Sequence, residues 1–150
     1  MSHVICLQNF QTVQLPLHID CECVPGRHST SAPSPQEVMS YIALTVFKTI
    51  DPSNQDQLNG FLQYLTEVRK VLIVDARPGS LIITVRCSSL QILDELWEDY
   101  RSGRLNGMAQ KFLVTDEILK KFGLKEANVT TIVLEEDYRV CRENFLAWSG

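Results

Sequence analysis

The sequence predicts an α+β fold, a two-layer α–β sandwich in which a four-stranded antiparallel sheet carries its helices mainly on one face. Three observations predict this fold. Segments with the period of strands alternate with segments of helical period. Two strands form a hairpin, and one strand alternates apolar and polar residues, as strands do when one face of a sheet is covered. The ferredoxin-like, split βαβ arrangement is the simplest topology for this order. We expect one domain over residues 1–150.

The first strand lies within residues 11–23 and has one dry and one wet face. Its apolar side chains point one way from Leu15 onward, while Pro16, His18, Asp20 and Glu22 point the other way. Because proline has no backbone N–H, we expect this strand to lie at a sheet edge or to begin at Pro16.

A loop rich in Pro, Ser and Gly follows over residues 24–36. Residues 1–10 and 24–35 are therefore the candidates for flexible segments. Pro35 suits the first turn of a helix, and apolar residues at helical spacing predict that this helix spans 35–50. Another short helix is expected around Leu58, Phe61, Leu62 and Leu65.

Two β-branched runs, 70–75 and 81–87, flank Pro78-Gly79 and predict a hairpin with a type II turn. A helix capped by Ser88 or Ser89 and ended by Gly103 should follow. The remaining expected elements are a short helix with Leu105, Met108 and Phe112, a helix from Thr115 to Gly123, a strand over 128–134 and a last helix over 135–148.

The stretch Asp94–Asp99 places carboxylates beside Trp97 and Tyr100 and raises the question of an acid/base site. At helical spacing, Leu93, Trp97 and Tyr100 form an apolar stripe, and Asp94, Glu95, Glu98 and Asp99 fall on the opposite side. Water would screen carboxylates there, so the sequence favours a solvated helix face over a catalytic pair.

Sulfur chemistry is equally disfavoured. His18, Cys21, Cys23 and His28 are close in sequence, but strand alternation sends His18 away from the two cysteines. The five cysteines are therefore interpreted as reduced, mostly buried thiols in the cytosol or nucleus. No nucleotide-binding or hydrolase motif occurs, so the sequence predicts a protein without enzymatic activity, cofactor or metal.

The bulk charge also excludes classes of partner. The formal net charge of −4 provides no basic field for nucleic acid. RNA-recognition domains of similar topology stack bases on aromatic residues of the central strands. The corresponding positions here are Ile82, Thr84 and Arg86. No apolar run is long enough to span a membrane.

The open face of the predicted sheet remains as the candidate site. It would carry mixed apolar and charged residues, which suit a transient protein interface. The alternative is an ordinary solvated sheet face. The candidate interaction residues are Ile82, Thr84, Arg86, His18, Asp20 and Glu22.

The segment from Ser34 to Leu146 resembles the N-terminal domain of the TNF-receptor-associated death-domain adaptor (TRADD) and the related TRADD-N-like modules. The similar features are the helix after Pro35-Gln36, the strand Leu81-Ile82-Ile83-x-Val85-Arg86, the motif Tyr100-Arg101-x-Gly103-x-Leu105 with Met108-Ala109-Gln110, and the last helix with Cys141.

The resemblance implies a non-catalytic adaptor in cytoplasmic death (apoptosis, TNF-type) or innate-immune signalling. In that family the open sheet face receives the TRAF domain of a TRAF protein, and Ile82 matches a residue of that face. The first strand departs from the family, because His18 and Asp20 stand where the adaptor presents aromatic residues. The segment LVTDEILKKFGL also departs, and the chain has no room for the adaptor's C-terminal death domain. We therefore expect a module of a larger signalling protein or a short relative.

The expected partner is a signalling protein, either of TRAF type or from the death-domain pathway. Two alternatives remain open. One is a small-molecule-binding regulatory or enzymatic domain, which predicts a closed pocket with perturbed carboxylates or thiols. The other is homo-oligomerisation through the edge strand with Pro16 or through the edge of the hairpin.

Overall fold

The computed structural model describes residues 12–26, 34–50, 59–77 and 81–149. Within them four strands form one antiparallel sheet with the order β2-β3-β1-β4. The strands are β1 (Val13–Pro25), β2 (Leu72–Arg77), β3 (Leu81–Cys87) and β4 (Leu124–Ile132). Since β3 lies between β1 and β2, which a helical segment connects, this is the split βαβ arrangement. The predicted α+β fold class is confirmed.

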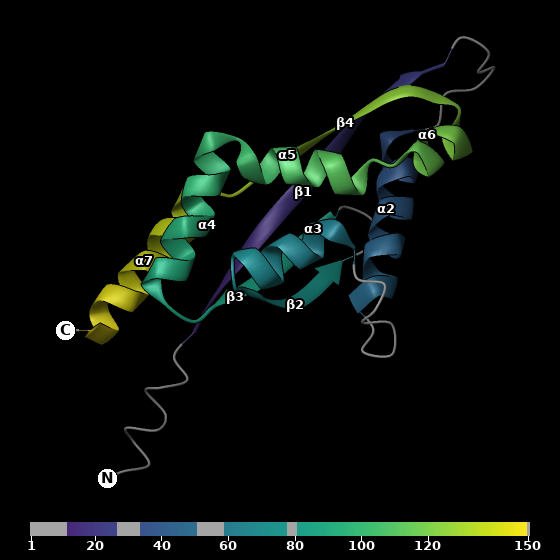
Figure 1. The fold of residues 1–150 in the computed structure, drawn as a ribbon. Helices are drawn as coiled ribbons and strands as arrows, with labels where there is room; N and C mark the ends of the chain where they lie inside the picture. The colour runs from purple at the N-terminus through teal and green to yellow at the C-terminus, as the bar shows by residue number, and fades with distance from the viewer. Residues whose placement is uncertain (1–11, 27–33, 51–58, 78–80, 150) are drawn as a thin grey trace.

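Helices follow β1, β3 and β4 along the chain (Figure 1). They are α2 (Pro35–Ile50), α3 (Gly60–Gln63), α4 (Leu90–Ser102), α5 (Arg104–Leu113), α6 (Asp116–Phe122) and α7 (Glu135–Ser149). A π-helical turn, η2 (Tyr64–Val68), continues α3. Figure 1 shows α3 and α5 lying across the sheet, while α4 and α7 run side by side.

The helices α4 and α6 begin and end at capping residues that the sequence predicts. The hydroxyl of Ser89 accepts a hydrogen bond from Ile92 N (3.1 Å) and caps α4. Gly103 ends α4 with φ 87°, a left-handed conformation that favours glycine. Thr115 and Gly123 cap α6 in the same two ways. These boundaries confirm the predicted starts and stops.

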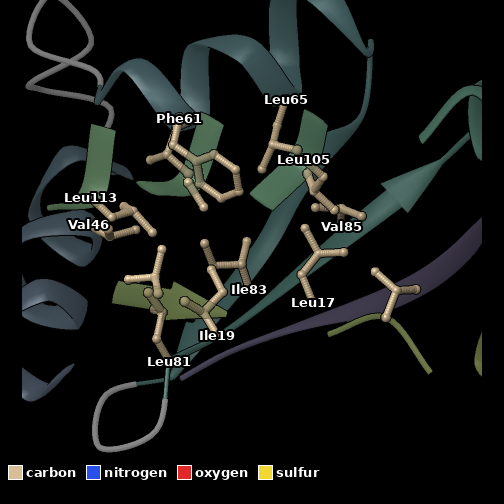
Figure 2. Packing of buried hydrophobic residues seen from close by; sticks show 14 of the residues in the cluster. Leu17, Ile19, Val46, Phe61, Leu65, Leu81, Ile83, Val85, Leu105 and Leu113 are labelled. Carbon is tan, nitrogen blue, oxygen red and sulfur yellow. The ribbon is translucent and has the colours of Figure 1, made fainter. Parts of the chain in front are cut away.

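The helices cover one face of the sheet and enclose the core there. Along β1 and β3 the residues that face the helices are buried, and their neighbours are half-buried or exposed. Figure 2 shows side chains of these strands meeting those of the helices in one cluster. The cluster includes Leu17, Ile19, Leu81, Ile83 and Val85 from the sheet, and Val46, Phe61, Leu65, Leu105 and Leu113 from the helical layer.

The expectation that β1 is an edge strand or begins at Pro16 is wrong, because β1 begins at Val13 and lies between β3 and β4. The proline is tolerated because β4 pairs with β1 only from His18 onward. Beside the start of β1, Cys141 Sγ of α7 donates to the carbonyl of Gln14 at 3.4 Å. Along a strand, the backbone N–H and C=O groups of residues two apart point to the same side. The backbone nitrogen of Pro16 therefore points to the same side as the carbonyl of Gln14, where no described strand pairs with β1 at this position.

Two predicted boundaries were also wrong. β1 continues through Val24 and Pro25, and β4 begins at Leu124 instead of residue 128, directly after α6 ends. These two extensions pair with each other in the antiparallel ladder, which is why both strands are longer than their local patterns indicate. The predicted turn at Pro78-Gly79, Leu58 and residues 1–10 lie outside the described residues.

Candidate protein-interaction surface

The face of the sheet opposite the core brings together the candidate residues of β1 and β3 with residues of the neighbouring strand β4. On β1 and β3, His18 pairs with Ile82, Pro16 with Thr84 and Gln14 with Arg86. On the other side of β1, His18 pairs with Ile132, Asp20 with Thr130 and Glu22 with Asn128. All six candidate residues lie on this open face. His18 lies at its centre, in one row with Ile82 and Ile132.

A groove lies at this central row. It has a volume of about 260 Å³ and is lined by His18, Ile19, Asp20, Leu81, Ile82, Ile132 and Leu134. Ile82 and Ile132 are half-buried, and Leu134 is 47% exposed. We call this feature the open-face groove. Three of the six candidate interaction residues, His18, Asp20 and Ile82, line this groove. The other three, Thr84, Arg86 and Glu22, lie further along the strands.

The sequence reasoning missed Ile132 and Leu134. The strand over 128–134 was predicted without assigning its faces, although its alternation places Ile132 with Asn128 and Thr130. Leu134 follows β4 and directly precedes α7. Strand alternation alone could have identified Ile132, whereas the position of Leu134 depends on how the chain leaves the sheet.

Charges are distributed unevenly around the groove. Asp20, Glu22 and Glu126 are exposed on the β1–β4 side of the open face. Asn128 Nδ2 donates to Glu126 Oε1 at 2.7 Å, which fixes one of these carboxylates beside its neighbour. Arg86 lies on the opposite side, on β3. The open face therefore carries acidic residues toward the end of β1 and Arg86 toward its start, with Ile82 and Ile132 between them.

The prediction that all four carboxylates of α4 face water is wrong for Asp99, which is 8% exposed. Its Oδ2 accepts a hydrogen bond from the hydroxyl of Tyr64 and lies 3.1 Å from Arg69 Nε. Arg104 Nε is 4.0 Å away. Burial and the hydrogen bond to Asp99 raise the pKa of Tyr64. Asp99 therefore has a structural role, joining α4 to the π-helical turn.

Asp94 is also engaged, because the hydroxyl of Tyr138 donates to its Oδ1 at 2.7 Å. Trp97 stacks on Tyr138 with 4.2 Å between ring centroids. Trp97 and Tyr100 of the predicted apolar stripe are half-buried and pack against the core, in which Leu93 and Leu96 are fully buried. The aromatic residues of α4 pack toward α7, which the sequence pattern of one helix does not reveal.

The thiols of Cys21 and Cys87 are unfavourable nucleophiles. Cys21 Sγ and Cys23 Sγ lie 3.8 Å apart on the core side of β1, and His18 lies on the opposite face. Burial raises the pKa of Cys21 and of Cys87 to about 12 in each case. Thiols with such pKa values are protonated at neutral pH. In the part of the chain that the structure describes, no group of three or more His, Cys, Asp or Glu residues could hold a metal ion.

A second hollow, of about 140 Å³, lies between α2, α5 and α6, where Ile42, Phe112 and Ile118 contribute to its lining. It is smaller than typical small-molecule sites, which measure roughly 300–1,000 Å³. Its carboxylate, Glu117, is exposed. This hollow therefore does not favour the alternative of a small-molecule site. A larger and more open hollow, of about 570 Å³, lies along α4 and is lined by Arg69, Leu90, Gln91, Asp94, Glu95, Glu98 and Asp99.

Comparisons with known proteins agree with the resemblance. Residues 52–118 match the TRADD-like N-terminal domain family. Proteins named death effector domain-containing protein, from Homo sapiens and Mus musculus, are 32% identical over 68 residues, which are 45% of this chain and 21% of theirs. The chain thus spans about a fifth of the length of these curated relatives. No solved structure matches the chain significantly.

The matched segment runs from before α3 to α6 and contains the hairpin and the Tyr100–Leu105 motif. The resemblance is confirmed over these residues, while the helix after Pro35 and the last helix lie outside the match. The matched family is described by its likeness to the TRADD N-terminal domain, and the matched relatives are named for a death effector domain. Among the described residues, no helix has the length and apolar character needed to cross a membrane.

Proposed function

We propose that this chain is a non-catalytic protein-interaction module of cytoplasmic signalling in apoptosis, TNF-type or innate-immune pathways. It binds its partner through the open sheet face, with Ile82, Thr84, Arg86, His18, Asp20 and Glu22 as contact residues. The observation that carries this proposal is the open-face groove. An apolar hollow with acidic residues to one side and a basic residue to the other has the composition of a transient interface, and the chain matches a death-signalling family.

The proposed partner is a signalling protein of the death pathway, and a TRAF-type domain is the form of partner that the resemblance favours. Ile82 supports this choice because it occupies the row of the groove and is the residue with a counterpart in the family. His18 and Asp20 replace aromatic residues of the adaptor, so this groove presents polar and charged side chains where the adaptor presents aromatic rings. Partner selection would follow from that difference, since specificity is a difference between affinities.

The test is capture of purified TRAF domains, and of proteins from cell lysate, by the intact chain and by variants. Ile82→Asp places a charge in the groove and should abolish capture, while Arg86→Glu should weaken it. Both positions lie on the uncovered face, so the melting temperature should stay within a few degrees of the unaltered protein. Val140→Asp is the matched control, because Val140 is 48% exposed on α7. Unchanged capture by Ile82→Asp would contradict the proposed surface.

A second candidate function is self-association through the edge of the hairpin. β2 is an edge strand, and Leu72 and Val74 on it are 62% and 40% exposed. The register shift between Ile73 and Asp75 is of the kind that blunts edge pairing, which makes this candidate the weaker one. Light scattering at several concentrations tests it, because a monomer at all concentrations contradicts self-association.

A further inference from the structure

We infer that the open-face groove is selective for a protein segment with an aliphatic anchor side chain flanked by lysine or arginine residues. The inference rests on the proposed function, because it concerns the chemistry of the partner at the same surface. Two independent features carry it, namely the apolar floor of the groove and the acidic residues that border the floor on one side.

The floor is suited to an aliphatic side chain. Ile82 and Ile132 flank His18 in one row, and Leu134, two residues after Ile132, also lines the groove and is 47% exposed. With about 260 Å³, the groove is too small for most small-molecule ligands, but it can receive a protruding side chain. Burial of such an anchor in a desolvated pocket supplies most of the energy of a small interface.

The border of the groove is acidic. Asp20 lines the groove, and Glu22 and Glu126 continue on the same face toward the end of β1 and the start of β4. Directly after Leu134, the first turn of α7 carries Glu135, Glu136 and Asp137. Among the described residues, no lysine or arginine lies within ion-pair distance of Asp20 or Glu22. Asp20 and Glu22 therefore have no described basic ion-pair partner on the sheet face.

Charge and shape together define the occupant. A segment that buries its aliphatic side chain over Ile132 and Leu134 must place its neighbouring residues beside Asp20 and the start of α7. Cationic neighbours are attracted there and acidic ones are repelled, which sets specificity and association rate more than affinity. Each exposed ion pair is individually weak, so several cations are needed to make the preference measurable.

The experiment uses the full chain and fluorescein-labelled peptides with leucines flanked by lysines, by serines or by glutamates. Fluorescence anisotropy gives the dissociation constants, and NMR shift mapping locates the bound peptide. The lysine peptide should shift resonances of Ile82, Ile132 and Leu134 and bind about tenfold or more tightly than the serine peptide. This advantage should disappear near 1 M salt, where charges are screened beyond roughly 3 Å.

Variants localise the effect. Asp20→Lys with Glu22→Lys should remove the preference for the lysine peptide, and Leu134→Ser should weaken all peptides. Glu117→Lys with Glu143→Lys is the control matched for net charge, because both glutamates are exposed and neither lines the open-face groove. Equal binding of the serine and lysine peptides would overturn the charge preference and leave the open-face proposal standing. A failure of Ile82→Asp to reduce protein capture would contradict the proposed function itself.

Discussion

The hydroxyl of Tyr64, in the π-helical turn, donates a hydrogen bond to the carboxylate of Asp99, in the last turn of α4. The same carboxylate oxygen lies 3.1 Å from Nε of Arg69. One buried acid thus joins two segments that are 35 residues apart in sequence. Removing it leaves a phenol and a guanidinium without their partner in a largely buried place, which is more costly than losing a surface ion pair.

We therefore expect Asp99→Ala to lower the free energy of unfolding by roughly 2–4 kcal/mol and Tyr64→Phe to lower it by about 1 kcal/mol. Denaturant titration monitored by circular dichroism measures both changes. Glu95→Ala is the control, since Glu95 is exposed and its contact with Arg69 is 3.5 Å long. It should change stability by less than about 0.5 kcal/mol. A similar effect of Asp99→Ala and Glu95→Ala would show that the buried cluster is not stabilising.

Gln110 of α5 acts on the edge of the sheet like a neighbouring strand. Its Nε2 donates to the carbonyl of Ala127, and its Oε1 accepts from the N–H of Val129, both at 2.8 Å. Asn106 adds a bond from Thr131 N to its Oδ1 at 2.7 Å. These amides satisfy the outward backbone groups of β4, an edge strand that would otherwise be open to pairing with other chains.

Gln110→Ala should therefore destabilise the protein by roughly 1–3 kcal/mol and promote self-association that increases with concentration. Denaturant titration measures the first effect and light scattering the second. Gln91→Ala is the matched control, because the Gln91 amide bonds to Glu95 on the surface of α4. A Gln110→Ala protein that stays monomeric and as stable as the unaltered one would contradict this role.

Local chemistry predicted much of the fold. The period of the strands, the Ser89 and Thr115 caps, and the glycines that end α4 and α6 were visible in the sequence and are confirmed. Alternation also placed His18 and Ile82 on one face. Asp99 was misplaced because the pattern of a single helix does not show a polar partner supplied by another segment. Leu134 and Gln110 were missed for the same reason. The residues that they contact belong to other segments and come close only once β4 has paired with β1.

Alkaline pH should destabilise the protein through its buried thiols. Burial raises the pKa of Cys87 from its ordinary value of 9.0 to about 12. Because the folded-state pKa is the higher one, this stabilisation is complete below pH 9 and is lost progressively as the pH rises toward 12. Each such thiol contributes a slope of up to about 1.4 kcal/mol per pH unit. Denaturant titrations between pH 7 and 10 should give a free energy of unfolding that is constant up to about pH 9 and then decreases.

A Cys87→Ala protein should be less stable at neutral pH, because a cavity forms, but its stability should fall less steeply above pH 9. Ile83→Val is the matched control, since it removes a buried methylene and no titratable group. In the Ile83→Val protein, the free energy of unfolding should decrease with pH as steeply as in the unaltered protein. An unchanged slope in Cys87→Ala would mean that Cys87 does not determine the alkaline limit.

Gly60 allows the start of α3 to pack against α5. A Cβ atom at this position would lie 2.2 Å from Cδ1 of Phe112, far closer than carbon atoms can approach. Gly107 provides a matched control within the same helical layer, because a Cβ atom there would meet nothing within 4 Å. Substitution of glycine by alanine is therefore expected to lower the stability of the protein at position 60 and to raise it at position 107.

Gly60→Ala should destabilise the protein by about 1–3 kcal/mol, because the ring of Phe112 must move or α3 must shift away from α5. Gly107→Ala should stabilise it by roughly 0.5–1 kcal/mol, since alanine restricts the unfolded chain and favours the interior of α5. Thermal and denaturant unfolding measure both effects. Combining Gly60→Ala with Phe112→Leu separates the causes. If steric contact with the ring is responsible, the alanine at position 60 costs less in the Phe112→Leu background, whereas an equal cost in both backgrounds would place the cause in the backbone of α3.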